Sequence, residues 1–250
     1  MAVILSGDFH SSGFGEAEVL KTKYLGIFCS LHGIKLPDIH YHIILGDGGA
    51  LWPDGKEADY CFEWLSMKPF ITLVLPGNHE PYPVIYDDRR KVQCAAAGIT
   101  GDSNTSLYKV YDNVFYFRRN CEYRIEGKKL LVLGGALSVD QDMREPYESW
   151  WPEELLSPQE EQELLSSTKG KTYDAVLSHT APFSRLPDIF ENRNFNDSGY
   201  PVDPTTQIYD RLIENIGCCN WYFGHFHRNT DKTIKGIYYH CLYKRIMLLK

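Results

Sequence analysis

The chain has 250 residues, 43% of them hydrophobic and 24% charged, so it is long enough to bury a large core and has an ordinary globular composition. It has no apolar run near the roughly 18 residues that a membrane span needs, and no signal-peptide pattern at its start. The net charge of −7 argues against a long nucleic-acid-binding surface, which needs a basic stripe. A small phosphorylated substrate remains compatible, because bound divalent cations would reverse the local charge.

The seven cysteines form an odd set without a CxxC pair, which favours a reduced, cytoplasmic protein. The adjacent pair Cys218 and Cys219 is interpreted as core filler, not as a metal site, because neighbours on a strand point to opposite faces.

Five apolar or β-rich runs each end in a polar cluster of the metal-ligand type. The runs are residues 2–6, 41–45, 71–76, 173–178 and 220–223. The clusters that follow them are Gly7-Asp8-Phe9-His10, Gly46-Asp47, Gly77-Asn78-His79-Glu80, His179 and Gly224-His225-Phe226-His227. The first four runs are nearly continuous in apolar residues, as buried parallel strands are. Because ligand sites of such sheets lie beyond the carboxyl ends of the strands, the clusters are expected to gather at one edge.

Amphipathic segments separate several of these runs. Helices are predicted over residues 16–32, closing at Gly33, over 56–67, ended by Pro69, and over 204–216, after the N-cap Asp203. Alternation of strands and helices predicts an α/β fold with largely parallel strands.

The middle of the chain has a different pattern. Short runs at 114–117, 121–125 and 129–133, with a turn at 126–127, indicate antiparallel strands of a second sheet. Residues 138–154 and 183–201 are predicted to form long loops, which in compact domains are often functional.

The polar clusters offer oxygen and nitrogen donors without thiolate. The candidate ligands are Asp8, His10, Asp47, Asn78, His179, His225 and His227. This donor set suits Mn, Fe, Zn or Ni at a catalytic site better than a structural zinc. The set is too large for one tetrahedral ion, whereas a bridging carboxylate divides it between two. Two metals about 3.5–4 Å apart lower the pKa of a shared water and clamp an in-line displacement, for which a phosphate ester is the natural target.

The order Gly-Asp-x-His, Gly-Asp, Gly-Asn-His-Glu, a His after a strand and Gly-His-x-His resembles the calcineurin-like metallophosphoesterase superfamily. The resemblance runs from Asp8 to His227. It implies an α/β fold in the form of a four-layer α/β/β/α sandwich, with two mixed β-sheets and the metal site at the strand carboxyl ends.

The resemblance also implies a division of the ligands. Asp8, His10 and His227 would hold one metal ion, and Asn78, His179 and His225 the other. Asp47 would bridge them. His79 would be the general acid that protonates the leaving oxygen, or would steady the scissile phosphate.

One segment departs from the family pattern. Many members carry an acidic residue three positions after the bridging Asp, where it orients the catalytic His, but this chain has Ala50 there. The Asp-Arg-Gly of protein Ser/Thr phosphatases is missing too, which argues against that branch. Asp54 and Asp59 are candidates for a substitute partner of His79.

Residues 134–154 resemble a stretch of bacterial and phage members of the family. Within it, Arg144 is expected near the mouth of the site, available for phosphate.

The sequence thus predicts one cytoplasmic metallophosphoesterase domain over residues 1–250. It would hydrolyse a phosphate mono- or diester with a hydroxide bridging two divalent metal ions. The catalytic candidates are Asp47 and His79, and the substrate-binding candidates Asn78, His79 and Arg144. The alternatives are a nuclease or nucleotide pyrophosphatase on the same core, and a non-catalytic metal-binding scaffold. The expected partner is a small phosphorylated substrate, with no membrane, with nucleic acid only as a substrate and with the oligomeric state left open.

Overall fold

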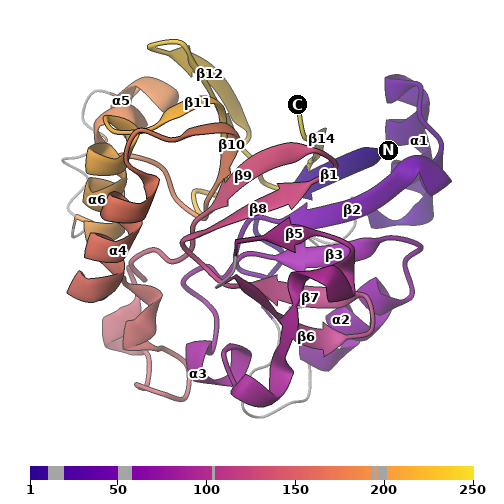
Figure 1. The fold of residues 1–250 in the computed structure, drawn as a ribbon, viewed down its shortest axis with the longest axis horizontal. Coiled ribbons are helices and arrows are strands. Elements are labelled where there is room, and N and C mark those ends of the chain that lie inside the picture. Colours follow the sequence, from indigo (N-terminus) through magenta and orange to yellow (C-terminus); the bar gives the residue numbers. More distant parts are fainter. Residues whose placement is uncertain (11–19, 50–57, 103–104, 193–194, 196–201) are drawn as a thin grey trace.

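The computed structural model describes residues 1–10, 20–49, 58–102, 105–192, 195 and 202–250. Two seven-stranded sheets pack face to face, and helices cover the outer face of each (Figure 1). Helices α1 and α2 lie against one sheet, and α4, α5 and α6 against the other. The predicted four-layer order of helix, sheet, sheet and helix is confirmed.

The described part of the chain has the following elements. The strands are β1 (Ala2–Ser6), β2 (Ile39–Ile44), β3 (Ile71–Val74), β4 (Lys91–Gln93), β5 (Thr100–Gly101), β6 (Ser106–Tyr111), β7 (Val114–Phe117), β8 (Cys121–Ile125), β9 (Lys128–Val132), β10 (Thr172–Leu177), β11 (Gly217–Phe223), β12 (Thr230–Ile234), β13 (Ile237–Cys241) and β14 (Ile246–Leu248). The α-helices are α1 (Thr22–His32), α2 (Ala58–Ser66), α3 (Tyr82–Ile85), α4 (Pro158–Thr168), α5 (Leu186–Ile189) and α6 (Pro204–Ile213). Short 3-10 helices cover Leu36–Asp38, Asp88–Arg90, Cys94–Ala97, Gln141–Met143, Pro152–Glu154 and Phe183–Arg185.

Parallel strands form the centre of both sheets. The first sheet has the order β14-β1-β2-β3-β7-β6-β4, in which β1, β2, β3 and β7 are parallel. The second has the order β12-β13-β11-β10-β9-β8-β5, in which β13, β11, β10 and β9 are parallel. Antiparallel strands complete each edge, so both sheets are mixed, as predicted.

Three apolar layers hold the sandwich together. One row of paired residues in the first sheet, Leu5, Ile43, Leu73 and Phe115, faces the second sheet and is buried. The alternate positions of these strands face α1 and α2, and those of the second sheet face α4, α5 and α6. Strands buried on both faces read as continuous apolar runs, which explains why they were recognisable in the sequence.

Strand β7 corrects the prediction for the middle of the chain. Residues 114–117 do not join the second sheet; they lie in the first, parallel to β3 and antiparallel to β6. Both faces of β7 are buried, one between the sheets and one under α2, which is the environment of a central strand. Strands β8 and β9 are antiparallel partners in the second sheet, as predicted, and their turn at 126–127 has positive φ at both residues.

Helix boundaries differ from the predictions for local reasons. Helix α1 begins at Thr22, because Lys21 is extended; the start predicted at residue 16 lies outside the described residues. It ends, as predicted, at Gly33, which has a φ of 64°. The start of α2 predicted at residues 56–57 lies outside the described residues. Helix α6 is capped by Asp203, as predicted, but it ends at Ile213 instead of residue 216. Just after this end, the side chain of Asn215 donates a hydrogen bond to the carbonyl of Arg211.

Two further expectations are corrected. Residues 186–189 form α5, not loop, because Leu186 and Ile189 bury their side chains against the second sheet. Cys219 is exposed and does not fill the core. On β11 its side chain points to the opposite face from Cys218, which is partly buried. None of the helices in the described ranges is both long and apolar enough to cross a bilayer.

Candidate metal centre

The polar clusters meet where strands of both sheets end. The loops after β1 and β2 are joined by hydrogen bonds from the backbone N–H groups of Phe9 and His10 to the carbonyl of Asp47, at 2.9 and 2.7 Å. The two sheets are joined by the N–H of His225, after β11, which donates to Oδ1 of Asp8 at 2.8 Å. The predicted convergence of the clusters at one edge is therefore confirmed, and it rests on the parallel strand directions.

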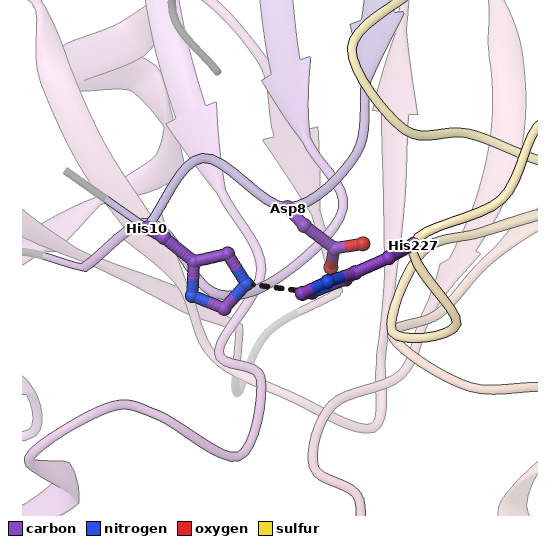
Figure 2. A group of neighbouring side chains, drawn as sticks. All are labelled: Asp8, His10 and His227. Atoms are coloured by element: carbon purple, nitrogen blue, oxygen red, sulfur yellow. Dashed lines mark hydrogen bonds between the residues drawn. The ribbon is translucent and has the colours of Figure 1, made fainter. Parts of the chain in front are cut away.

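Asp8, His10 and His227 form one group of facing donors, shown in Figure 2. One potential ligand atom from each lies within 4.8 Å of the others. The Nε2 atoms of His10 and His227 are 2.9 Å apart, and Nε2 of His10 is 3.7 Å from Oδ2 of Asp47. Two imidazole nitrogens at this distance need a proton on one of them or a cation shared by both lone pairs.

A second group forms around the amide oxygen of Asn78. Its Oδ1 atom is 3.0 Å from Nε2 of His179 and 3.1 Å from Nδ1 of His225. Nε2 of His179 is also 3.3 Å from Oδ2 of Asp47. Asp47 thus borders both groups. The bridging role that the resemblance implies for it stays a prediction.

The hydrogen bonds of His179 test whether a cation fits this second group. Its Nδ1 donates to the carbonyl of Leu45 at 2.8 Å, and a carbonyl can only accept, so Nδ1 carries a proton. In the neutral ring, Nε2 then turns a lone pair toward the oxygens of Asn78 and Asp47. Three lone pairs that face one another require positive charge between them, as a divalent cation would supply. The residues therefore fit a metal ion.

The pKa values of the buried side chains also favour a cation at this site. Burial, offset in part by His179, raises the pKa of Asp8 to about 7. Burial opposes a charge on His179 too, yet Asp47 and Asp8 raise the pKa of its imidazole to about 10. In the described part of the chain, Oδ2 of Asp8 is buried without a hydrogen-bond partner. Without a cation, the cluster would have to bind protons to compensate its negative charge.

The backbone is strained at this edge. His10, Asp47, His225 and His227 all have positive φ, between 44° and 67°. A left-handed conformation is unfavourable for residues other than glycine and collects at functional sites. Here it lets each side chain turn back toward the common centre.

Close backbone packing completes the site. A Cβ atom at Gly77 would lie 2.2 Å from Oδ1 of Asp47 and 2.9 Å from Nε2 of His179. Only glycine lets the loop after β3 pass this near to the Asp47 carboxylate.

A family model described as calcineurin-like phosphoesterase matches residues 1–229. The chain belongs to this family. It is therefore a hydrolase of phosphate esters, in a family that typically binds divalent metals. Its structure is similar to that of a phosphopantetheinyl hydrolase from Mycobacterium tuberculosis, with a TM-score of 0.45 and 11% identity over 96% of this chain and 87% of the other. A search of curated proteins gave no match.

Glu80 braces two loops of this phosphoesterase. The side chain is fully buried, and its carboxylate accepts hydrogen bonds from the N–H groups of Gly48 and Gly77, at 2.6 and 2.5 Å. These glycines follow the ends of β2 and β3. Glu80 thus ties the loop that carries Asp47 to the loop that carries Asn78.

Asn78 is oriented by residues that sequence reasoning did not single out. Its Nδ2 donates to Oγ of Ser138 at 3.0 Å, and Oγ of Ser138 donates to Oε2 of Glu154 at 2.6 Å. The N–H of Ser138 donates to Oε1 of Glu154 at 2.8 Å. All three side chains are buried. The hydroxyl of Ser138 donates to Glu154, so toward Asn78 it acts as an acceptor. The amide of Asn78 therefore turns its nitrogen toward Ser138 and its oxygen toward His179 and His225.

His79 lies at the mouth of the site. Its side chain is 22% exposed, and its Nε2 is 4.0 Å from Oδ2 of Asp47. Its backbone N–H donates a hydrogen bond to Oδ1 of Asp47 at 3.0 Å. Burial lowers the pKa of the imidazole; Arg144 lowers it further, while Asp47 raises it. His79 thus borders the candidate metal centre and belongs to neither group of facing donors.

Arg144 lies near His79, but its guanidinium is already engaged. Nη2 pairs with Oδ2 of Asp140 at 2.7 Å, and Nη1 donates to the carbonyl of Ser149 at 3.1 Å. Its role toward phosphate stays a prediction. Ala50 and Asp54 lie outside the described residues, as does the side chain of Asp59. The orientation of His79 by Asp54 or Asp59 therefore stays a prediction.

Proposed function

We propose that this phosphoesterase hydrolyses a phosphate mono- or diester with two divalent cations held by the residues at the strand ends. Asp8, His10 and His227 would hold one cation, Asn78, His179 and His225 the other, and Asp47 both. The mixed oxygen and nitrogen donors suit Mn, Fe, Zn or Ni.

One observation carries this proposal. Nε2 of His179 lies 3.0 Å from Oδ1 of Asn78 and 3.3 Å from Oδ2 of Asp47, while its Nδ1 is used by the carbonyl of Leu45. The lone pairs of three ligands from separate strands are aimed at one another. In the other group that Asp47 borders, the Nε2 atoms of His10 and His227 also face each other, at 2.9 Å.

The bound cations would polarise the phosphoryl group and lower the pKa of a coordinated water. The protein's own contribution is to place the reacting groups. Glu80 and Gly77 keep the loops after β2 and β3 tightly packed, and Ser138 fixes the direction of the Asn78 amide. Such prior positioning makes electrostatic stabilisation effective, because little has to reorganise during the reaction.

His79 would act as the general acid. Its imidazole is partly exposed beside Asp47, so a phosphate ester in the site can reach it. Burial lowers its pKa in the free protein, but an anionic phosphate next to the ring would favour the protonated form. His79 would then deliver its proton to the leaving oxygen, while Asn78 and Arg144 would contact the phosphate.

The proposal is tested by measuring hydrolysis after removal of metals and reloading with Mn²⁺. Aryl phosphomonoesters, aryl phosphodiesters and single-stranded DNA are supplied in parallel. The proposal predicts that activity toward an aryl ester is lost with the metals and returns with Mn²⁺. Activity that survives complete metal removal would contradict it, and activity on DNA alone would favour the nuclease alternative.

A further inference from the structure

A cavity of about 410 Å³ opens beside the candidate metal centre. Its walls are mainly apolar and come from the loops after β9, β10 and β11, the segment around α5 and the start of α6. The apolar wall residues include Leu137, Val139, Phe183, Leu186 and Phe226. Its volume falls in the range of roughly 300–1,000 Å³ that is typical of sites for small organic ligands.

His225 joins the cavity to the metal centre. The residue belongs to the cavity wall, and its Nδ1 atom is 3.1 Å from Oδ1 of Asn78. A phosphate ester bound at the cations would therefore have an apolar space next to it for its organic group. Phosphate and cavity would be parts of one substrate site.

The mouth of the cavity exposes apolar surface. Val139 and Val202 line the cavity and are 57% and 42% exposed, among the few large apolar side chains of the described residues that are open to solvent. Exposed apolar side chains that border a pocket gain free energy when a ligand covers them.

The polar wall residues are Thr180, Asn192, Asp203, Thr206, His225 and Arg228. Thr180 is fully buried in the wall, and its hydroxyl is without a hydrogen-bond partner in the described structure. Arg228 is also part of the wall, with its guanidinium carbon 5.4 Å from the ring centroid of Phe190. Such a lining suits a mainly apolar group with a few polar atoms, attached to an anion.

We propose that this cavity binds the organic group of the substrate, and that the enzyme prefers phosphate esters of aliphatic or aromatic alcohols over esters of compact polar alcohols such as glycerol. The inference rests on the proposed function, because it uses the cations to hold the phosphate. It adds the class of alcohol that the site selects.

A series of straight-chain alkyl phosphates tests it on the Mn²⁺-loaded protein. From ethyl to butyl to hexyl phosphate the reactivity of the bond changes little, while the apolar area grows. Each added methylene should raise kcat/KM by up to about fourfold, mainly through a lower KM, until the cavity is full. A kcat/KM that is constant or falls along the series, or that is highest for glycerol phosphate, would overturn the inference. Failure to hydrolyse these esters and the aryl mono- and diesters alike would instead contradict the proposed function.

Binding provides a readout that does not depend on turnover. Hexylphosphonate, which cannot be hydrolysed, should bind the metal-loaded protein more tightly than ethylphosphonate in calorimetry, with a more negative heat-capacity change. Equal affinity of the two phosphonates would overturn the inference.

Variants at the wall locate the effect. Val139→Trp should fill the mouth and reduce the ratio of kcat/KM for hexyl over ethyl phosphate to near one, whereas Leu31→Trp on the exposed face of α1, where Leu31 is 79% exposed, should keep the wild-type ratio. Phe183→Ala should enlarge the cavity and move the optimum to longer chains. Wild-type chain-length profiles in both cavity variants would assign the selectivity elsewhere and overturn the proposal.

Discussion

Ser138 accepts a hydrogen bond from the side-chain amide of Asn78 at 3.0 Å, and its own hydroxyl donates a hydrogen bond to the buried carboxylate of Glu154. This relay connects the long loop after β9 to the candidate metal centre. It determines which end of the Asn78 amide faces His179 and His225, since an amide turned the other way would present N–H groups to the cation position.

Ser138→Ala should therefore weaken metal binding. The amide of Asn78 would lose the acceptor that orients it, and changes of this kind behind a ligand typically cost about 10–100-fold in metal affinity. Metal affinity is measured by competition with a chelator. Thr72→Val, which removes a buried hydroxyl from β3 outside the site, is the matched control and should retain wild-type affinity. Unchanged affinity in folded Ser138→Ala would show that the relay does not position the ligand.

Gly77→Ala should disrupt the site by steric overlap. The new methyl would lie 2.2 Å from Oδ1 and 2.5 Å from the backbone N of Asp47, and neither atom can move without displacing a candidate ligand. We expect a loss of about 1–3 kcal/mol in the free energy of unfolding together with loss of bound metal.

Gly26→Ala is the control for that substitution. A Cβ at Gly26, within α1, meets nothing within 4 Å, so this change should leave metal content intact and stabilise the helix by up to about 1 kcal/mol. Denaturant unfolding and elemental analysis check both variants. A Gly77→Ala protein with full metal content and wild-type stability would contradict the packing argument.

His79→Ala should separate chemistry from metal binding. If His79 donates the proton to the leaving group, its removal lowers kcat by about 10²–10⁴-fold while metal content stays at the wild-type level. Asp47→Asn should lose both turnover and metal, because Asp47 borders both ligand groups. Single-turnover rates at matched metal loading decide the point, and wild-type rates in His79→Ala would exclude it as the general acid.

His42 should make stability depend on pH. Its ring is buried, shares a hydrogen bond of 2.8 Å with the hydroxyl of Ser6 and contacts the rings of Phe9 and Phe70. Burial, with a smaller effect of Lys68, lowers the pKa of its imidazole from 6.5 to about 3. Between these values the unfolded chain takes up a proton that the folded chain does not. The contribution of His42 to the free energy of unfolding therefore falls as pH decreases, by up to about 1.4 kcal/mol per pH unit.

His42→Leu should remove that slope. Urea unfolding at a series of pH values from 8 to 4 should show wild type losing stability more steeply than the variant below about pH 6.5, with parallel curves above it. Parallel curves over the whole range would mean that His42 titrates normally in the folded protein.

The sequence was most informative where physical constraints are local. Buried parallel strands read as continuous apolar runs, and the polar clusters directly follow them, so the strand ends and the convergence of Asp8, Asp47 and Asn78 could be predicted. The cap of α6 at Asp203 and the end of α1 at Gly33 were also local signals. Helix α4 has one too, a capping box between Ser157 and Glu160.

Non-local pairing could not be obtained in the same way. Which sheet β7 joins depends on partners far along the chain, and its own residues suit either sheet. The same holds for the relay, since Asn78 and Ser138 are 60 residues apart and their hydrogen bond exists only in the folded chain. Tyr243, which stacks on His227 with ring centroids 4.7 Å apart, reaches the centre from the far end of the sequence in the same manner.

The central claim is that residues from separate strands hold two cations around Asp47. Anomalous-scattering crystallography of the metal-loaded protein, combined with elemental analysis, measures this directly. The account predicts two ions per chain, with Asp47 coordinating both and His10 and His225 on different ions. A single ion, or ions that leave Asp47 uncoordinated, would contradict it.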